Sequence, residues 1–287
     1  MLHARPAPRL TLYTTMACPY AHRAMLAIEL RPIPGVKREL ITTTNQFTTI
    51  NKQGLPRGDA LEMFAEASVE GLQQKKEAYK RDVNPSGEVP SLLLPTCDVV
   101  SESEIVCEYI DAVSERDSPR LMPSDPLAAA RVRLAMKRFN SCPSAIVALL
   151  KNQDEARDEA LTAQLDAALA GFVATIDASG GEPESGFCFG RDCTLADVHA
   201  APFVFRFEPV LRHYRGYNMI ERVPRLGLLL RAMAALPEWE RCLRPPDGSY
   251  PAVTTERLLA LYAAYANDGR WAEGPEGPVL AGRGAKQ

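Results

Sequence analysis

Segments with the pattern of β-strands are confined to the first 101 residues of this chain, whereas every later patterned segment is helical. Strand-like alternation occurs at 9–14, 36–42, 91–94 and 98–101. Helical spacing of apolar residues follows the first strand and resumes from Ser103 onward. This order predicts an α/β unit followed by an all-α unit. A chain of 287 residues is long enough for two such domains.

The boundary between the two units is expected in a polar, proline-rich segment. The stretch "SERDSPRLMPSDP" (114–126) has no hydrophobic periodicity and is typical of a linker. We therefore expect an N-terminal domain at 1–113 and a helical C-terminal domain at 127–267. The helices expected in the second domain are 127–151 with an interruption at Pro143, 154–178, 194–214 beginning with a Thr194/Asp197 capping pattern, 224–235 and 254–266.

Two further segments depart from this regular scheme. Residues 43–74 form a long insertion that is polar at first, and a helix is expected from about residue 59 to residue 80. A surface insertion with a packing helix is the simpler interpretation, and a substrate lid is the alternative. The last twenty residues, 268–287, are rich in glycine and proline, and we expect them to be disordered.

Composition and charge exclude several classes of function. The net charge of −3 and the pI of about 5.9 give no basic surface for nucleic acid. No stretch approaches the roughly 20 apolar residues of a membrane helix, and the N-terminus lacks the apolar region of a secretory signal. A soluble protein of the cytoplasm is therefore expected, with neither nucleic acid nor membrane as a partner.

The seven cysteines and four histidines are scattered along the chain. No cysteine belongs to a C-x-x-C pair, and the odd number does not suit a disulfide framework in a chain of this size. Paired ligands at close spacing, which a structural zinc site needs, are missing. We expect no metal, and we expect most of the cysteines to be small buried hydrophobic residues.

Cys18 differs from the other cysteines because it stands between an expected strand and a helix that starts at Pro19. The free amides and the dipole of a helix N-terminus favour an anion, so a thiol placed there is expected to ionise more readily. His22 and Arg23, one turn later, could add positive charge. Taken alone, the position is also compatible with a buried and inert cysteine.

Two later features strengthen the interpretation of Cys18 as a nucleophile. Val89-Pro90 precedes a strand, and a proline at this point is often cis, which would offer the backbone of Val89 to an extended peptide. Glu102-Ser103 opens a helix, where a hydroxyl and free amides suit a carboxylate and the glutamate suits an ammonium group. Together they predict a thioredoxin-like site for a small zwitterionic peptide that carries a thiol.

Five motifs carry a resemblance to a known family. The N-terminal domain contains "CPYAHR", "NPSGEVPSLLL" and "SESEIVCEYIDA", the linker and the start of the helical domain contain "RLMPSDPLAAAR", and the C-terminal domain contains the looser "TLADVHAAPF". They resemble cytosolic glutathione transferases of the cysteine-type classes, most closely the omega class. The resemblance implies a thioredoxin-like domain followed by an all-α domain, glutathione as co-substrate, a small electrophile or mixed disulfide as second substrate, and a homodimer.

The resemblance implies a role for each matching residue. Cys18 would form a mixed disulfide with glutathione. Val89, held before Pro90, would pair through its backbone with the cysteinyl part of glutathione. Glu102 and Ser103 would hold the γ-glutamyl end.

The remaining candidates rest on looser matches. Lys76, or the adjacent Lys75, would reach the glycyl carboxylate, although the insertion at 43–74 departs from the family pattern just before it. The candidates for the pocket of the second substrate, between Cys18 and the helical domain, are Tyr20, Phe203 and Arg206.

Ala21 replaces any resolving cysteine in the motif, which favours chemistry with a single thiol. We expect thiol transferase and dehydroascorbate-reductase-like activity, with weak conjugation. One alternative is a glutathionyl-hydroquinone reductase or lambda-like transferase. The other is a non-catalytic binding module built on the same fold.

Overall fold

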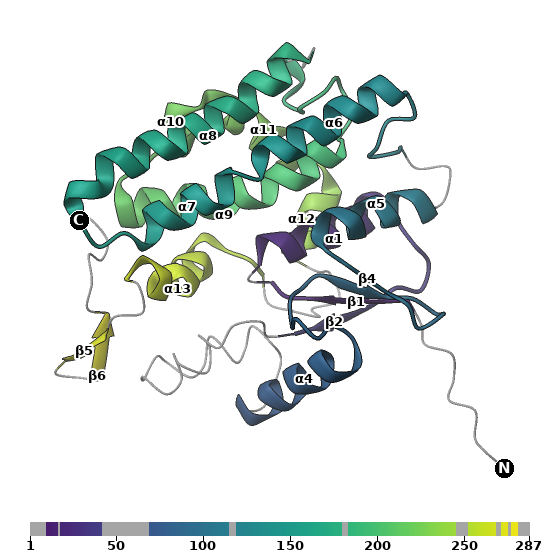
Figure 1. Ribbon diagram of the computed structural model, residues 1–287, viewed down its shortest axis with the longest axis horizontal. Coiled ribbons are helices and arrows are strands. Elements are labelled where there is room, and N and C mark those ends of the chain that lie inside the picture. The colour runs from purple at the N-terminus through teal and green to yellow at the C-terminus, as the bar shows by residue number, and fades with distance from the viewer. Residues whose placement is uncertain are drawn as a thin grey trace.

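The computed structural model describes residues 10–16, 18–41, 69–114, 119–179, 183–244, 252–267, 271–274 and 277–280. A small mixed sheet with its helices forms one part of the molecule, and a layer of longer helices forms the other (Figure 1). The order of elements confirms the predicted α/β unit followed by an all-α unit. None of the helices in the described residues combines the length and the apolar character that crossing a membrane would require.

The sheet has four strands in the order β2-β1-β3-β4. The parallel pair β1 and β2 is joined through helix α1, whereas β3 runs antiparallel to both β1 and β4. In this register Tyr13 lies opposite Ser91, and Ser91 lies opposite Ser101. The end of β1, the start of β3 and the end of β4 therefore meet at one edge of the sheet. The strands are β1 (Thr11–Thr14), β2 (Lys37–Leu40), β3 (Ser91–Leu93) and β4 (Val99–Ser101).

Helices α1 (Pro19–Leu30) and α5 (Ser103–Val113) cover one face of the sheet, and α4 (Val69–Asp82) lies on the opposite face (Figure 1). Pro19 suits the first turn of α1, because its missing N–H would have no partner there. On the other face, the ring of Tyr79 packs against Tyr13 with the centroids 5.1 Å apart.

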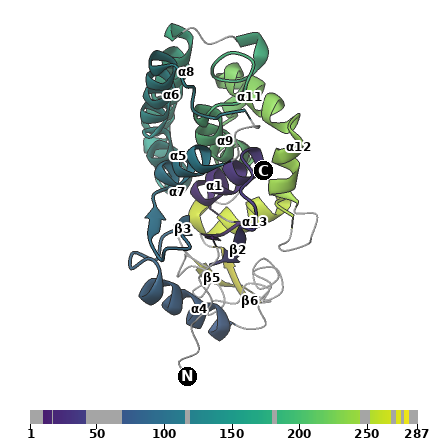
Figure 2. The same ribbon diagram turned by 90° about the vertical axis from the view of Figure 1, so that its right-hand side faces the viewer.

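The helical part is built around α9, which is buried along most of its length and packs against α1, α6, α7, α11 and α13 (Figure 2). A capping box of Thr194 and Asp197 starts α9, as the sequence predicts, and Gly216 ends it with a φ of 65°. The helices of this part are α6 (Pro126–Phe139), α7 (Cys142–Lys151), α8 (Asp158–Ala178), α9 (Leu195–Arg215), α10 (Met219–Arg222), α11 (Pro224–Ala234), α12 (Pro237–Leu243) and α13 (Thr255–Ala266), with short 3-10 turns at Glu155–Arg157 and Pro183–Ser185.

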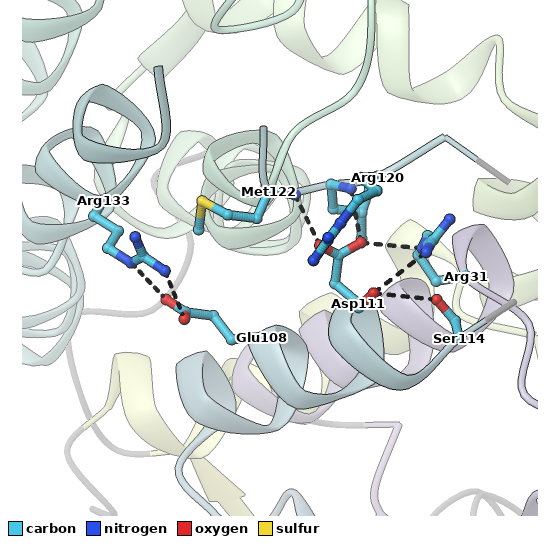
Figure 3. A network of polar contacts seen from close by, with 8 residues as sticks. Arg31, Glu108, Asp111, Ser114, Arg120, Met122 and Arg133 are labelled. Carbon is cyan, nitrogen blue, oxygen red and sulfur yellow. Dashed lines mark hydrogen bonds and ion pairs between the residues drawn. The ribbon is translucent and has the colours of Figure 1, made fainter. Parts of the chain in front are cut away.

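A buried carboxylate connects the two parts of the chain. Asp111, near the end of α5, accepts hydrogen bonds from the backbone N–H groups of Leu121 (2.8 Å) and Met122 (3.0 Å) (Figure 3). Its Oδ1 also lies 3.0 Å from Nε of the buried Arg31, just after α1. The segment that leads into the helical part is thereby held against α1 and α5.

The interruption expected at Pro143 is confirmed: the segment 127–151 is two helices separated at Asn140–Ser141, because Pro143 fits the first turn of a new helix better than the middle of an old one. Other sequence expectations need correction. The short helices α10 and α12 were not predicted. Strands β5 (Trp271–Gly274) and β6 (Gly277–Leu280) pair as an antiparallel hairpin inside the tail expected to be disordered, since two short segments flank a two-residue connection. Residues 42–68, which include most of the insertion expected at 43–74, lie outside the described residues.

Candidate active site

A cavity of about 640 Å³ lies at the edge of the sheet where β1, β3 and β4 meet. Its walls come from three segments: the start of α1, the turn that leads into β3, and the junction of β4 with α5. The sheet register brings the start of α1 together with the other two segments, which follow it by about 65 to 85 residues along the chain. The lining residues are Cys18, Tyr20, Asn84, Ser86, Glu88, Val89, Pro90, Ser101, Glu102 and Ser103.

Cys18 precedes the first turn of α1 with extended backbone angles, φ −93° and ψ 124°. Burial raises the pKa of the Cys18 thiol above its ordinary value, while the backbone N–H groups of Ala21 and Tyr20 and the charges of Arg206 and Arg23 lower it less strongly. The expectation of a readily ionised thiol is therefore wrong for the protein without ligand. The helix N-terminus acts in the expected direction, but loss of hydration is the larger effect.

The expected charge at His22 is also wrong, and Arg206 does not lie on the cavity wall. Both side chains are buried. Nη1 of Arg206 donates to Nδ1 of His22 at 2.6 Å, which assigns the ring proton to Nε2. Burial and the Arg206 charge hold the pKa of His22 well below its usual range, so the ring is neutral. Nη2 of Arg206 donates to the carbonyl oxygen of Met16 at 3.0 Å, just before Cys18.

The peptide bond between Val89 and Pro90 is cis, as expected, and both residues line the cavity. The backbone before it is held by Tyr79 of α4, whose Oη donates to the carbonyl oxygen of Glu88 at 2.5 Å. Nδ2 of Asn84 donates to the same oxygen at 3.1 Å. Helix α4 thus positions the edge of backbone that the sequence assigns to the ligand.

Glu102 and Ser103 form the opposite wall, at the start of α5. Glu102 has a φ of 69°, a conformation that costs a residue with a side chain about 1–3 kcal/mol and that is concentrated at functional sites. Glu102 is the residue that precedes the helix, and Ser103 is its first residue. The Glu102 side chain makes no capping hydrogen bond, so the first amides of α5 can serve a ligand.

The lysines expected at the glycyl end of glutathione do not line the cavity within the described residues. Nζ of Lys75 lies 3.5 Å from Oε2 of Glu39 on β2. Lys76 lies beside it on α4 and is partly buried. Its role at the glycyl carboxylate stays a prediction.

The three candidates for the second substrate pocket separate in the structure. Tyr20 is 40% exposed and lines the cavity, whereas Phe203 is 2% exposed and packs edge-on beneath Tyr20, with the ring centroids 4.8 Å apart. Phe203 is part of the core, like Arg206, because its position on α9 faces α1 and α6 rather than the cavity.

Sequence reasoning missed the tyrosines of α13. The charge of a Cys18 thiolate contributes to the raised pKa of Tyr265 and of the buried Tyr262, so both tyrosines lie near Cys18. Helix α13 contains no recognised motif, so nothing in the sequence indicated that these tyrosines lie near Cys18. Asn84, Ser86 and Glu88 were also missed as lining residues, although the "NPSGE" turn before Val89 could have indicated them.

All seven cysteines are unpaired, and the four at 107, 142, 188 and 242 are buried, as expected for small hydrophobic residues. Cys18 is the one cysteine on the cavity wall among the residues that the structure describes. Over the same residues, no three His, Cys, Asp or Glu side chains are placed to hold a metal ion.

An α/β domain with a cysteine at the start of its first helix and a cis-proline before its third strand, followed by an all-α domain, defines a class of thiol-handling proteins. The chain matches the family model of the glutathione S-transferase N-terminal domain over residues 17–113 and that of the glutathione S-transferase C-terminal domain over residues 142–241. It belongs to the cytosolic glutathione transferase superfamily and is similar to the omega class.

Individual relatives are distant. Glutathione S-transferase omega-2 of Mus musculus is 29% identical over 140 residues, which are 48% of this chain and 43% of that protein, so the match spans less than half of the relative. The fold is similar to that of glutathione transferase Omega 3C from Trametes versicolor, with a TM-score of 0.63 at 21% identity over 83% of this chain and 90% of the other. It is also similar to dehydroascorbate reductase of Chlamydomonas reinhardtii, with a TM-score of 0.55 at 21% identity over 90% and 99% of the two chains.

Proposed function

We propose that this protein is a glutathione-dependent thiol transferase and reductase that uses Cys18 as its nucleophile. The observation that carries the proposal is that Cys18, the Val89 edge and the N-terminus of α5 line one cavity. A thiol peptide bound between the last two would place its sulfur at Cys18. The superfamily binds glutathione, and the likeness to a dehydroascorbate reductase supports a reductase activity.

Glutathione fits the polar groups of the cavity. Its γ-glutamyl carboxylate suits Ser103 Oγ and the first amides of α5, and its ammonium group suits Glu102. Its cysteinyl backbone suits the N–H and C=O of Val89, which Tyr79 and Asn84 hold in place through Glu88. The glycyl carboxylate would reach toward α4, where Lys76 is the proposed partner.

The proposed chemistry exchanges disulfides through one cysteine. The Cys18 thiolate attacks the glutathione sulfur of a glutathionylated substrate, which leaves as its thiolate while the Cys18–glutathione disulfide forms. A second glutathione loses its thiol proton and attacks that disulfide, which releases glutathione disulfide and restores the Cys18 thiolate. Reduction of dehydroascorbate would consume two glutathione molecules and yield ascorbate and one glutathione disulfide. Ala21 offers no second thiol, so the electrons must come from the second glutathione.

Arg23 and Arg206 support the thiolate. Their charges lower the pKa of Cys18 against the effect of burial, and the amides of Tyr20 and Ala21 act in the same direction. Conjugation is expected to be weak, because a cysteine placed beside the glutathione sulfur is itself captured as the disulfide.

The test is mass spectrometry of the protein after mild treatment with glutathione disulfide. We expect one glutathione adduct, on Cys18, and we expect Cys18→Ala to abolish reduction of a small mixed disulfide. Cys97→Ala is the matched control, because Cys97 is exposed and does not line the cavity. Modification of other cysteines with Cys18 untouched, or full activity of Cys18→Ala, would overturn the proposal.

Measurements of turnover and of glutathione binding separate the alternative functions. Faster turnover of a glutathionyl-hydroquinone than of a mixed disulfide would favour the hydroquinone reductase. Binding of glutathione without thiol exchange above background would favour a non-catalytic module. A cytoplasmic location stays a prediction.

We further propose that the working form is a homodimer. Large apolar side chains are exposed on the neighbouring helices α5 and α6, which Glu108 and Arg133 link: Ile105 is 57% exposed, Leu127 60% and Leu134 46%. Apolar side chains gathered on one face are typical of association surfaces. Sedimentation should give a dimer for the parent protein and a monomer for Leu127→Glu; a monomeric parent protein would contradict the proposal.

A further inference from the structure

We propose that Arg23 is a positioning residue that completes the site for the ligand's γ-glutamyl carboxylate by acting through Ser103 from beneath the cavity. The inference rests on the proposed function, because it assumes that glutathione occupies the cavity. Ser103 lines that cavity, whereas Arg23 lies behind it and is 1% exposed.

The hydrogen bonds of Arg23 connect three parts of the molecule. Its Nη1 donates to Ser103 Oγ at 3.1 Å, on the first turn of α5. Its Nε donates to the carbonyl oxygen of His199 at 2.8 Å, on α9 of the helical domain. Arg23 itself belongs to α1, one turn after Cys18. Arg23 therefore connects the Ser103 side of the cavity, where the ligand carboxylate would bind, to helix α1 and to the helical domain.

The bond to Ser103 directs the hydroxyl proton. A guanidinium can only donate, so Ser103 Oγ must act as the acceptor. The hydroxyl proton is then free to point away from Arg23, into the cavity that Ser103 lines. Ser103 is thus prepared to donate to an anionic oxygen.

The charge of Arg23 points to an anion as the missing partner. Within the described residues no carboxylate lies within ion-pair distance of Arg23, and its buried Nη2 has no hydrogen-bond partner. Burial lowers the pKa of Arg23 to about 10, so the side chain remains a cation at neutral pH. Among the acids, Glu104 of α5 acts on it at longer range. A buried cation without a counterion is unfavourable, and a ligand carboxylate on Ser103 would compensate it.

Two aromatic rings hold the guanidinium in place. Its carbon lies 4.9 Å from the ring centroid of Tyr20 and 4.8 Å from that of Phe203. These contacts stabilise the cation and restrict its movement. Tyr20 also lines the cavity, so Arg23 supports a polar and an aromatic part of the same wall.

The test removes the charge from the protein and from the ligand in turn. Calorimetry measures the binding of S-methylglutathione and of the S-methyl derivative of 4-aminobutanoyl-cysteinylglycine, which lacks only the γ-glutamyl α-carboxylate. The S-methyl group keeps the chemistry of Cys18 out of the measurement. We expect the parent protein to prefer S-methylglutathione by at least about tenfold, as for a charged hydrogen bond.

In Arg23→Met, which keeps the bulk of the side chain, that preference should fall by about tenfold. Arg23→Lys keeps the cation but loses the planar fork, and it should retain part of the preference. Arg133→Met, at an exposed arginine paired with Glu108, is the control and should retain all of it.

The preference for the ligand with the carboxylate distinguishes a positioning role of Arg23 from a merely structural one, because loss of structure alone would weaken the binding of both ligands equally. An unchanged preference in a folded Arg23→Met or Arg23→Lys would overturn the inference while leaving the proposed function intact. Equal binding of both ligands by the parent protein would overturn it without any variant, which covers a variant that fails to fold. Failure of the parent protein to bind either ligand would instead contradict the proposed function, and the inference with it.

Discussion

At the scale of single residues, surroundings rather than residue type separate Cys18 from the other six cysteines. Cys107, Cys142 and Cys242 are buried among apolar side chains, and burial raises the pKa of each thiol strongly. Burial also raises the pKa of Cys18, but here two backbone amides and two arginines oppose it. Among the cysteines in the described residues, Cys18 is the one that lines the cavity together with the backbone of Val89. Its position is therefore more informative about its function than its pKa is.

The raised pKa leads to a prediction about pH. The thiol form is favoured in the folded protein, so the thiolate should appear at higher pH than in the same cysteine of the unfolded chain. The rate of alkylation of Cys18 by iodoacetamide should therefore rise with a midpoint above that measured for Cys18 in urea. Peptide mass spectrometry at a series of pH values gives both midpoints. A folded-state midpoint equal to or below the unfolded one would contradict this assignment of the dominant effect.

At the scale of secondary structure, the helix starts differ in how their first amides are satisfied. The N-termini of α1 and α5 face the cavity with few side-chain caps. In contrast, α9 is capped completely: Asp197 accepts from the N–H and the hydroxyl of Thr194, both at 2.8 Å, and from the N–H of Cys188 at 2.6 Å. The starts of α1 and α5 therefore leave amides available at the proposed site, whereas the capped start of α9 supports the core of the helical domain.

Loss of the α9 cap should destabilise the protein. Asp197→Ala would leave three donors unpaired in a buried position, which we expect to lower the free energy of unfolding by about 3 kcal/mol. Urea unfolding followed by circular dichroism measures the change. Asp192→Ala, at an exposed position just before the helix, is the control and should change stability by less than about 0.5 kcal/mol. A similar small change for both variants would contradict the role of the cap.

At the scale of the whole molecule, α1 and α5 belong to the sheet domain but also contact the helical part: both pack against α9, and α1 packs against α12 as well. The two parts share one apolar core. The Asp111 network adds polar contacts where the chain passes from one to the other (Figure 3). Two arginines also join α1 to α9: Arg23 of α1 donates to His199, and Arg206 of α9 donates to His22. The geometry of the site therefore depends on how the two domains pack together.

The two carboxylates drawn in Figure 3 allow a matched comparison. Asp111→Ala would leave the buried Arg31 without its counterion and two amides without acceptors, so we expect a loss of about 3–5 kcal/mol in the free energy of unfolding. Glu108→Ala breaks an exposed pair with Arg133 and should cost less than about 1 kcal/mol. Thermal and urea unfolding of the two variants give the comparison. Equal effects would show that burial does not decide the strength of these pairs.

Local patterns were enough to predict much of the fold. The strand, proline and helix around Cys18, the two short strands before α5 and the Thr194/Asp197 cap depend on neighbouring residues, and these predictions agree with the structure. Periodicity failed at α10 and α12, which are too short to show it.

The sequence by itself determined the two-part architecture and brought Cys18, Val89-Pro90 and Glu102-Ser103 to one cavity, because motifs of adjoining strands keep their order and spacing. Only the tertiary structure decided the electrostatics. The packing of α1 against α9, more than 170 residues later, decides whether Cys18 ionises and whether His22 is charged. The same packing decides whether Arg206 and Phe203 of α9 face the cavity or the core. Loss of hydration is a property of the packed molecule, and no local pattern in the sequence reports it.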